Sequence, residues 1–417
     1  MAKIIPRHIA NSVTLDFEDI DAVFINGPRQ AGKSTFTESF AQSYKKTEYI
    51  TFDDITARGA ETVSPGSSFE SITEGLVILD EIQLVPNSFL ALKQKIDKAR
   101  RKKENVKFLL TGSADIKLFP KLSEALVGRM YIRTLFPFST AEIFETRGDF
   151  LQKIFCSPPD ITRLCSKFNF LTAVSGATFP KLSLDIKNKT QWCQSYITAL
   201  LERDVKNISD IDKIEILPQL LSVLASRAGS LLNEADLAGA VKISQPTLKR
   251  YRTLLDGIFL TFLVPPWFKN LEKRFVKSPK IYFGDTLLLC HLLGLLPEEV
   301  KTVRPETYGF ILENFIAVEL KKQLSLMDDG KLFHLRTSDL KEIDFIVEKR
   351  NGDILAIEVK AAKTVVPDDF KHILFLQKSI DRKFIRGIVL YTGDKIVEFG
   401  KDLYAIPVTA LWENIFP

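Results

Sequence analysis

The segment Gly-Pro-Arg-Gln-Ala-Gly-Lys-Ser at residues 27–34 limits the fold of this 417-residue chain more than any other feature. It matches the phosphate-binding pattern G-x-x-x-x-G-K-[ST] at every fixed position. The apolar run at residues 22–25 predicts a buried strand before it, and residues 35–41 predict a helix after it, which is the context that the pattern requires. Glycines let backbone N–H groups face phosphate oxygens, and the helix N-terminus adds its positive dipole. The sequence therefore predicts a P-loop in an α/β fold.

The residues of this loop define a candidate nucleotide site. Lys33 supplies a positive charge to the β- and γ-phosphates of ATP, and the hydroxyl of Ser34 is suited to ligate Mg²⁺. We therefore expect ATP and Mg²⁺ as cofactors. The predicted nucleotide-binding residues are Gly27, Pro28, Arg29, Gln30, Ala31, Gly32, Lys33, Ser34 and Thr35.

A second apolar run, at residues 76–79, ends in the acidic pair Asp80 and Glu81. Such a run is typical of a buried parallel strand, and ligands gather at the C-terminal ends of strands in open α/β sheets. Asp80 is the candidate to hold Mg²⁺, and Glu81 is the candidate to orient or deprotonate the attacking water. The alternative, a strand that ends in two solvated acids, is disfavoured by the phosphate loop upstream.

Two further positions are candidates for contact with the γ-phosphate. Residues 106–113 predict another buried strand with polar residues at its tip, where Thr111 is the first candidate for a sensor and Ser113 the second. Arg129 is the candidate arginine finger, which would stabilise charge on the transferred phosphoryl group from a neighbouring subunit. The alternatives are a plain strand-to-turn transition and a surface arginine. If Arg129 acts in trans, the active form is a homo-oligomer, with a hexameric ring as the candidate arrangement.

Taken together, these motifs resemble those of a known family. The similarity includes the phosphate loop, the Leu-Asp-Glu-Ile-Gln at residues 79–83, the Leu-Thr-Gly-Ser at residues 110–113 and the Val-Gly-Arg at residues 127–129. The chain resembles AAA+-type P-loop ATPases of bacteria and archaea that carry a winged-helix region and a C-terminal restriction-endonuclease-like, PD-(D/E)xK domain. The function of that family is uncharacterised, so the resemblance implies architecture more firmly than substrate.

The resemblance implies an α/β fold class in four parts. These are a P-loop AAA+ ATPase core at residues 1–139, a helical lid at residues 140–216, a winged helix-turn-helix at residues 217–272 and an α/β restriction-endonuclease-like domain at residues 273–417. Within the lid, Arg203 is a candidate phosphate contact, and a salt-bridged helix end is the alternative.

The winged helix-turn-helix also has local signals. Asn233 and Ser244 are suited to cap two successive helices, and residues 259–264 predict the wing strand that follows. Residues 241–280 hold nine Lys and Arg against two acidic residues, which suits nucleic acid. A winged helix used for protein contact is the alternative. The candidate DNA contacts on the second helix are Thr247, Lys249, Arg250 and Arg252.

A second candidate chemical site lies near the C-terminus. Residues 342–347 and 354–360 predict two strands joined by an Asn-Gly turn. Asp344, followed by Glu358-x-Lys360, resembles the PD-(D/E)xK motif, with Glu313 as the acid on a preceding helix. Residues two apart on a strand point to one face, so Glu358 and Lys360 project together.

This arrangement predicts a second metal, Mg²⁺ or Mn²⁺, held by Asp344 and Glu358. The proline of the strict motif is replaced by Ile343. A restriction-like fold that is retained for DNA binding without cleavage is the alternative.

Composition bears on metal sites and on the cellular location of the protein. The four cysteines lack C-x-x-C spacing and the histidines number only four, which disfavours a structural zinc site and indicates reduced thiols in the cytoplasm. We find no signal-peptide core and no apolar stretch long enough to cross a bilayer, so we expect a cytoplasmic protein without membrane association.

The sequence leads to one functional hypothesis with two alternatives. The first is a Mg²⁺-dependent ATPase that binds and remodels or translocates DNA, including branched or broken DNA in repair or defence. The alternatives are an ATP-dependent metal nuclease that cuts DNA, and a nucleotide-switched regulatory or adaptor protein.

Overall fold

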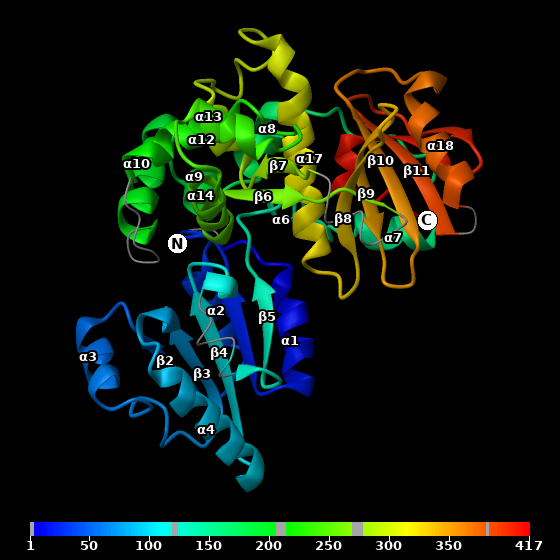
Figure 1. Ribbon diagram of the computed structural model, residues 1–417. Coiled ribbons are helices and arrows are strands. Elements are labelled where there is room, and N and C mark those ends of the chain that lie inside the picture. Colours follow the sequence, from blue (N-terminus) through cyan, green and yellow to red (C-terminus); the bar gives the residue numbers. More distant parts are fainter. Residues whose placement is uncertain (1–3, 119–123, 125, 206–213, 269–277, 381–382) are drawn as a thin grey trace. The chain divides into compact units, whose positions relative to one another are not determined.

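The structure is a computed structural model that describes residues 4–118, 124, 126–205, 214–268, 278–380 and 383–417 (Figure 1). The chain divides into two compact units. Unit 1 comprises residues 1–137 and 257–259, and unit 2 comprises residues 138–256 and 260–417. Among the described residues, no helix is both long and apolar enough to cross a membrane.

Unit 1 is built on a five-stranded sheet with the order β2-β3-β4-β1-β5, in which all neighbouring strands are parallel. Strands β1, β3 and β4 are buried over their last five residues, which lead into the predicted motifs. Such burial is expected where helices cover both faces of a sheet. This confirms the α/β class and the predicted apolar strands. The strands are β1 (Ala22–Asn26), β2 (Thr47–Thr51), β3 (Glu74–Asp80), β4 (Asn105–Gly112) and β5 (Met130–Thr134).

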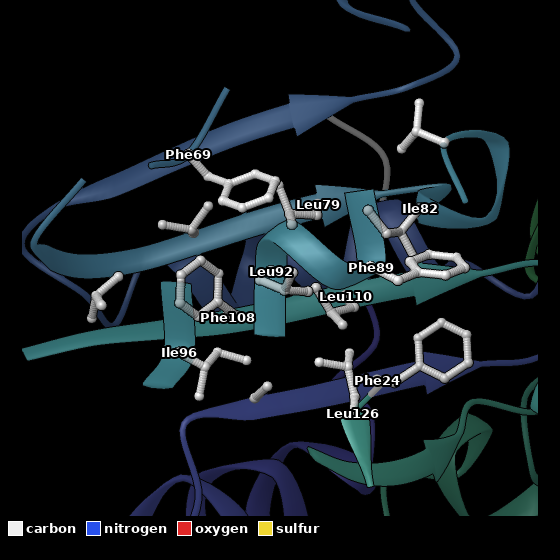
Figure 2. Close-up of a cluster of buried hydrophobic side chains, with 14 of the residues drawn as sticks. Phe24, Phe69, Leu79, Ile82, Phe89, Leu92, Ile96, Phe108, Leu110 and Leu126 are labelled. Atoms are coloured by element: carbon white, nitrogen blue, oxygen red, sulfur yellow. The ribbon is translucent and has the colours of Figure 1, made fainter. Parts of the chain in front are cut away.

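One helix of unit 1 packs on this sheet through an apolar face (Figure 2). In α4 (Ser88–Lys102), the side chains of Phe89, Leu92 and Ile96 recur at helical spacing and are buried. They join Phe108 and Leu110 of β4 in one core, where each side chain contributes about 1.5–3 kcal/mol. The other helices are α1 (Ile9–Asp19), α2 (Lys33–Ala41) and α3 (Ile55–Val63).

Unit 2 begins with a helical region and continues into a three-helix and hairpin motif. Helices α6 (Thr140–Ile143), α7 (Phe150–Cys156), α8 (Phe170–Gly176), α9 (Pro180–Leu184) and α10 (Lys189–Ala199) lie in the predicted lid segment. They are followed by α12 (Leu217–Ala225), α13 (Glu234–Ala240), α14 (Gln245–Gly257) and the strands β6 (Thr261–Val264) and β7 (Lys280–Phe283). β6 and β7 pair antiparallel, as expected for a wing.

The rest of unit 2 is built on a six-stranded mixed sheet with the order β12-β13-β11-β10-β9-β8 (Figure 1). β9 and β10 form the predicted antiparallel hairpin, while β10, β11 and β13 run parallel. The strands are β8 (Lys331–Arg336), β9 (Glu342–Glu348), β10 (Ile354–Lys360), β11 (Phe384–Tyr391), β12 (Val397–Gly400) and β13 (Leu403–Pro407). The helices are α16 (Thr286–Leu292), α17 (Tyr308–Leu324) and α18 (Lys371–Ile380).

Candidate active site

The phosphate loop links β1 to α2 and depends on two glycines. Gly27 has a φ of +152°, and a Cβ there would lie 2.2 Å from the backbone oxygen of Leu135, so no other residue fits. Gly32 has a φ of +91° and is the residue before α2, which begins at Lys33. The first N–H groups of α2 have no partners within the helix and are therefore available to an anion at the loop.

Lys33 and Arg7 fix the charge and the shape of this loop. The Lys33 side chain is buried, and its Nζ donates to the backbone oxygens of Gly27, at 3.1 Å, and Pro28, at 3.0 Å. The Arg7 guanidinium donates to the backbone oxygens of Ala31, at 2.9 Å, and of Phe136. Arg7 lies outside every sequence motif, so its role here was not predicted.

Asp80 gathers hydroxyl groups from three other elements. Its carboxylate accepts hydrogen bonds from Ser34, at 3.2 Å, from Tyr49, at 2.8 Å, and from Thr111. The two predicted Mg²⁺ ligands, Ser34 and Asp80, thus lie within one hydrogen bond of each other. Hydroxyl and carboxylate oxygens are donors that suit Mg²⁺, so these residues fit the ion that the P-loop implies.

Tyr49 is a site residue that the sequence reasoning missed. It lies on β2, next to β3, and places its hydroxyl on the Asp80 carboxylate. Burial, together with the charge of Asp80, raises the pKa of Tyr49 well above its usual value. The phenol therefore stays protonated at neutral pH and acts as a donor.

Glu81 follows β3 in a constrained conformation. Its φ of +54° is in the left-handed region, which costs a residue with a side chain about 1–3 kcal/mol. Its backbone N–H donates to the Thr111 hydroxyl at 3.0 Å, and its carboxylate accepts a hydrogen bond from Gln83. Gln83 also donates to the hydroxyl of Ser113 at 3.2 Å. Both sensor candidates thus hold the acidic pair, Thr111 directly and Ser113 through Gln83.

Arg129 forms a two-pronged ion pair within unit 1. Its Nε and a terminal nitrogen donate to the two carboxylate oxygens of Asp97, on α4, at 2.7 and 3.1 Å. This pairing lowers the pKa of Asp97 below its usual value. A role for Arg129 as an arginine finger would therefore require that this ion pair open. The side chain of Arg203, the other arginine candidate, lies outside the described part of the structure.

The two predicted helix caps, at the starts of α13 and α14, form as the sequence predicts. Asn233 accepts a hydrogen bond from the backbone of Asp236, and Ser244 accepts one from the backbone of Thr247. Along α14, Lys249 and Arg250 are exposed and Thr247 is half-buried. Arg252 departs from its predicted role as a DNA contact.

The Arg252 side chain is buried because it joins α13 to α14. Its guanidinium pairs with Asp256, at 3.1 Å, and with Glu234, at 3.4 Å. These contacts satisfy its charge inside the motif, so it lacks the exposure that a groove contact requires.

The four residues of the candidate nuclease site gather at one place in unit 2. Glu313 on α17 and Asp344 on β9 both bind the ammonium of Lys280, at 3.0 and 3.2 Å. The Asp344 carboxylate also accepts a hydrogen bond from the backbone of Val359, next to Glu358. Lys360 lies 3.6 Å from the Glu358 carboxylate.

Three residues of this cluster were not predicted, namely Lys280, Tyr282 and Glu342. Lys280 and Tyr282 stand two apart on β7 and reach the same carboxylate, because the Tyr282 hydroxyl donates to Glu313 at 2.6 Å. Glu342 binds the Lys280 ammonium at 3.0 Å. The alternation of Lys and Tyr at residues 280 and 282 was the signal available in the sequence.

The predicted second Mg²⁺ or Mn²⁺ does not fit this cluster as the structure describes it. The Lys280 ammonium lies at its centre, and the part of the chain described here contains no group of three or more His, Cys, Asp or Glu residues arranged to hold a metal ion. Burial raises the pKa of Glu313 and of Glu358, and the charge of Asp344 raises both further. Burial alone would lower the pKa of Lys280, but the charges of Asp344, Glu313 and Glu342 outweigh it and raise that pKa overall.

The P-loop, the acidic end of β3 and the parallel sheet define the core of a P-loop ATPase, and comparison with known families agrees. Residues 19–144 match the family model described as "AAA domain". Residues 178–299 and 308–411 match two models that are described as domains of unknown function, DUF8612 and DUF4143. The AAA domain indicates ATP binding and hydrolysis.

Two curated relatives align with most of the chain. These are the uncharacterized proteins Rv2008c of Mycobacterium tuberculosis and Mb2031c of Mycobacterium bovis. Each is 27% identical to this chain over 386 residues, which are 92% of this chain and 79% of the relative.

Solved structures share a more distant likeness. The Walker-type ATPase paby2304 of Pyrococcus abyssi is 15% identical with a TM-score of 0.42, over 69% of this chain and 96% of that one. A variant of RuvB from Thermotoga maritima is 16% identical with a TM-score of 0.29, over 61% of this chain and 86% of that one.

Proposed function

We propose that this protein is a Mg²⁺-dependent ATPase whose hydrolysis cycle drives the binding and remodelling or translocation of DNA. The observation that supports hydrolysis is the convergence of Ser34, Tyr49 and Thr111 on the Asp80 carboxylate. It joins α2, β2, β3 and β4 in one site, beside Glu81. Support for DNA comes from the exposed Lys249 and Arg250 on the second helix of a helix-turn-helix motif that is followed by a β-hairpin.

In the proposed reaction, the triphosphate binds along residues 27–35, where the N-terminus of α2 and the Lys33 ammonium offset its charge. Mg²⁺ held by Ser34 and Asp80 would neutralise charge on the β- and γ-phosphate oxygens. Glu81 accepts a proton from a water molecule while the oxygen of that water attacks the γ-phosphorus. The bond from this phosphorus to the bridging oxygen breaks, and ADP and phosphate are the products.

We also propose that the chain works as a homo-oligomer in which Arg129 reaches the nucleotide of a neighbouring subunit. An arginine is well suited to charge that develops on a transferred phosphoryl group. In this proposal, Arg129 stays in its ion pair with Asp97 until a neighbouring subunit brings a nucleotide site within its reach.

The first experiment measures ATP turnover without DNA and with single-stranded, duplex or four-way-junction DNA, using Lys33→Ala as the blank. We expect at least one DNA form to stimulate turnover. Lys249→Ala with Arg250→Ala should reduce this stimulation and flatten its dependence on salt by about one unit of slope per lost phosphate contact. Lys331→Ala, an exposed lysine on β8, is the matched control and should retain the stimulation.

Turnover that no DNA changes would contradict the DNA part of this proposal. It would favour the regulatory or adaptor alternative, in which the helix-turn-helix binds protein. Loss of turnover in Lys33→Ala, with or without DNA, tests the ATPase part separately.

A further inference from the structure

The acidic cluster of unit 2 already contains a cation. The Lys280 side chain, at the start of β7, is only 3% exposed, and its Nζ lies 3.0 Å from Glu313, 3.0 Å from Glu342 and 3.2 Å from Asp344. An ammonium group has three N–H donors, and here three separate carboxylates accept from it. Each N–H donor of Lys280 therefore has one carboxylate acceptor.

The distances in this cluster suit an ammonium group and not a bare divalent ion. Mg²⁺ requires oxygen ligands at about 2.1 Å in near-octahedral geometry, and larger hard cations bind at about 2.3–2.6 Å. Carboxylate oxygens placed about a nitrogen at 3.0–3.2 Å would have to move inward to bind either. An ion bound by Glu313, Glu342 and Asp344 would also require Lys280 to leave, because its Nζ occupies the position between them.

Each carboxylate is held in place by a second partner. The Tyr282 hydroxyl donates to Glu313 at 2.6 Å, and the backbone of Val359 donates to Asp344 at 2.9 Å. Arg336 lies 3.5 Å from the second oxygen of Glu342. The three carboxylates around Lys280 are thus each held twice, whereas among the described residues the buried Oε2 atom of Glu358 has no hydrogen-bond partner.

Lys360, the lysine of the predicted nuclease motif, has a different environment. Its side chain is 36% exposed and lies 3.6 Å from Glu358 and 3.5 Å from Asp369, away from the centre of the cluster. It therefore provides a control, since it is a second lysine of the predicted site that pairs with other acids.

We propose that Lys280 is the resident cation of this centre, that it occupies the place of the divalent ion in a metal-dependent nuclease, and that the centre consequently neither binds Mg²⁺ or Mn²⁺ nor cuts DNA. The role of Lys280 is structural. Lys280 belongs to the β6–β7 hairpin, while its three partners belong to α17 and β9. The ion pairs thus fasten the hairpin that follows the helix-turn-helix to the nuclease-like sheet.

The test is metal uptake by full-length chains in which Asp80→Asn removes the contribution of the ATP site. Bound Mn²⁺ is counted by the loss of its free electron paramagnetic resonance signal, and the melting midpoint is recorded with and without millimolar MnCl₂. The series compares the Asp80→Asn chain with the same chain carrying Lys280→Ala, Lys280→Met or the control Lys360→Met.

With Lys280 present, we expect no Mn²⁺ bound and no change of midpoint on adding MnCl₂, and the same for Lys360→Met. Lys280→Ala should lower the midpoint, take up one Mn²⁺ per chain and recover stability as Mn²⁺ is added, because a ligand of the folded state stabilises it. Adding Asp344→Asn should abolish that uptake. If Lys280→Ala does not fold in buffer, Mn²⁺ should promote its refolding. Lys280→Met removes the charge but fills most of the space, so it should lower the midpoint without taking up Mn²⁺.

Two results would overturn the proposal. One is Mn²⁺ bound by the chain that retains Lys280 and lost with Asp344→Asn, or DNA nicking by the unsubstituted protein with the same dependence. The other is failure of Lys280→Ala to bind Mn²⁺ or to be stabilised or refolded by it, since the cluster would then not be a cation centre. The readout does not depend on ATP hydrolysis, so the proposed function can fail or hold independently.

Discussion

Thr111→Val should separate a structural role of this residue from a role as a phosphate sensor. The Thr111 side chain is buried, and its hydroxyl donates to the Asp80 carboxylate and accepts from the backbone of Glu81. Valine has a similar shape and lacks both hydrogen bonds. A hydrogen bond to a charged group contributes about 1.5–3 kcal/mol, and an unpaired buried N–H costs about 1–3 kcal/mol. Because the site can relax in part, we expect a loss of about 3 kcal/mol from unit 1.

This loss should appear in the absence of any nucleotide. For a unit of this size, it corresponds to a fall of about 10 °C in the melting midpoint, measured by calorimetry. Turnover should fall about 100-fold, because Glu81 is displaced from its position at the end of β3. Thr111→Ser retains the hydroxyl and is the matched control, with a midpoint and turnover close to those of the unsubstituted chain.

The outcome that refutes this reasoning is specific. If Thr111→Val loses turnover while its nucleotide-free midpoint is unchanged, the hydroxyl acts on the γ-phosphate and does not hold the acidic pair. Unchanged turnover together with an unchanged midpoint would remove Thr111 from the site.

Tyr49→Phe removes one hydrogen-bond donor from Asp80 and should raise the Mg²⁺ concentration needed for half-maximal turnover. A hydroxyl added by Phe52→Tyr, at the buried residue after β2, should not replace the lost one. An unchanged Mg²⁺ titration of Tyr49→Phe would contradict this role. Mixing Lys33→Ala chains with Arg129→Ala chains should restore part of the turnover that each has lost, and no recovery at any ratio would contradict action in trans. Iodoacetamide should label Cys156, which is exposed, before Cys165, because burial raises the pKa of the Cys165 thiol to about 11; mass spectrometry gives the order, and equal rates would be the adverse result. Burial and the charge of Lys280 lower the pKa of His334 to about 4. The neutral ring therefore stabilises the fold above the unfolded pKa of about 6.5, and this contribution is lost as the pH falls toward 4. The free energy of unfolding should fall by up to about 3 kcal/mol over this range. Histidine-selective NMR should show this pKa, and a ring that titrates near 6.5 would contradict it.

The candidate ATP site could be predicted because most of its polar residues lie in two short motifs. The fixed residues of the P-loop and the apolar run before Asp80 each carry enough local pattern to identify a strand end or a loop. Their supports are not local. Arg7 and Tyr49 reach the site only because the fold brings their segments beside β1 and β3, and no spacing in the sequence marks them, whereas Gln83 follows β3 within the motif at residues 79–83.

The fold shows the same division between local and distant information. Strands β1, β3 and β4 were predicted because long apolar runs fit few alternatives, whereas α1 and α3 carried too little signal. In α1, no side chain caps the first turn and no acidic residue lies there. Asp16 of this helix is instead paired with Arg133 at 2.6 Å, from a position 117 residues away. Such a pair favours the helix only after the sheet has formed.

Lys280 shows why a motif of acidic residues is insufficient to predict chemistry. The spacing of Asp344, Glu358 and Lys360 reflects the geometry of two paired strands, and in the structure Asp344 binds the backbone next to Glu358 while Lys360 lies 3.6 Å from Glu358. It contained no information about the residue that fills the centre, since that residue comes from β7, outside the motif. A lysine in a sequence is normally taken as exposed, and burial becomes favourable only when several carboxylates surround it. Whether such a cluster binds a metal is therefore decided by a third element, and replacing its one lysine is the direct way to find out.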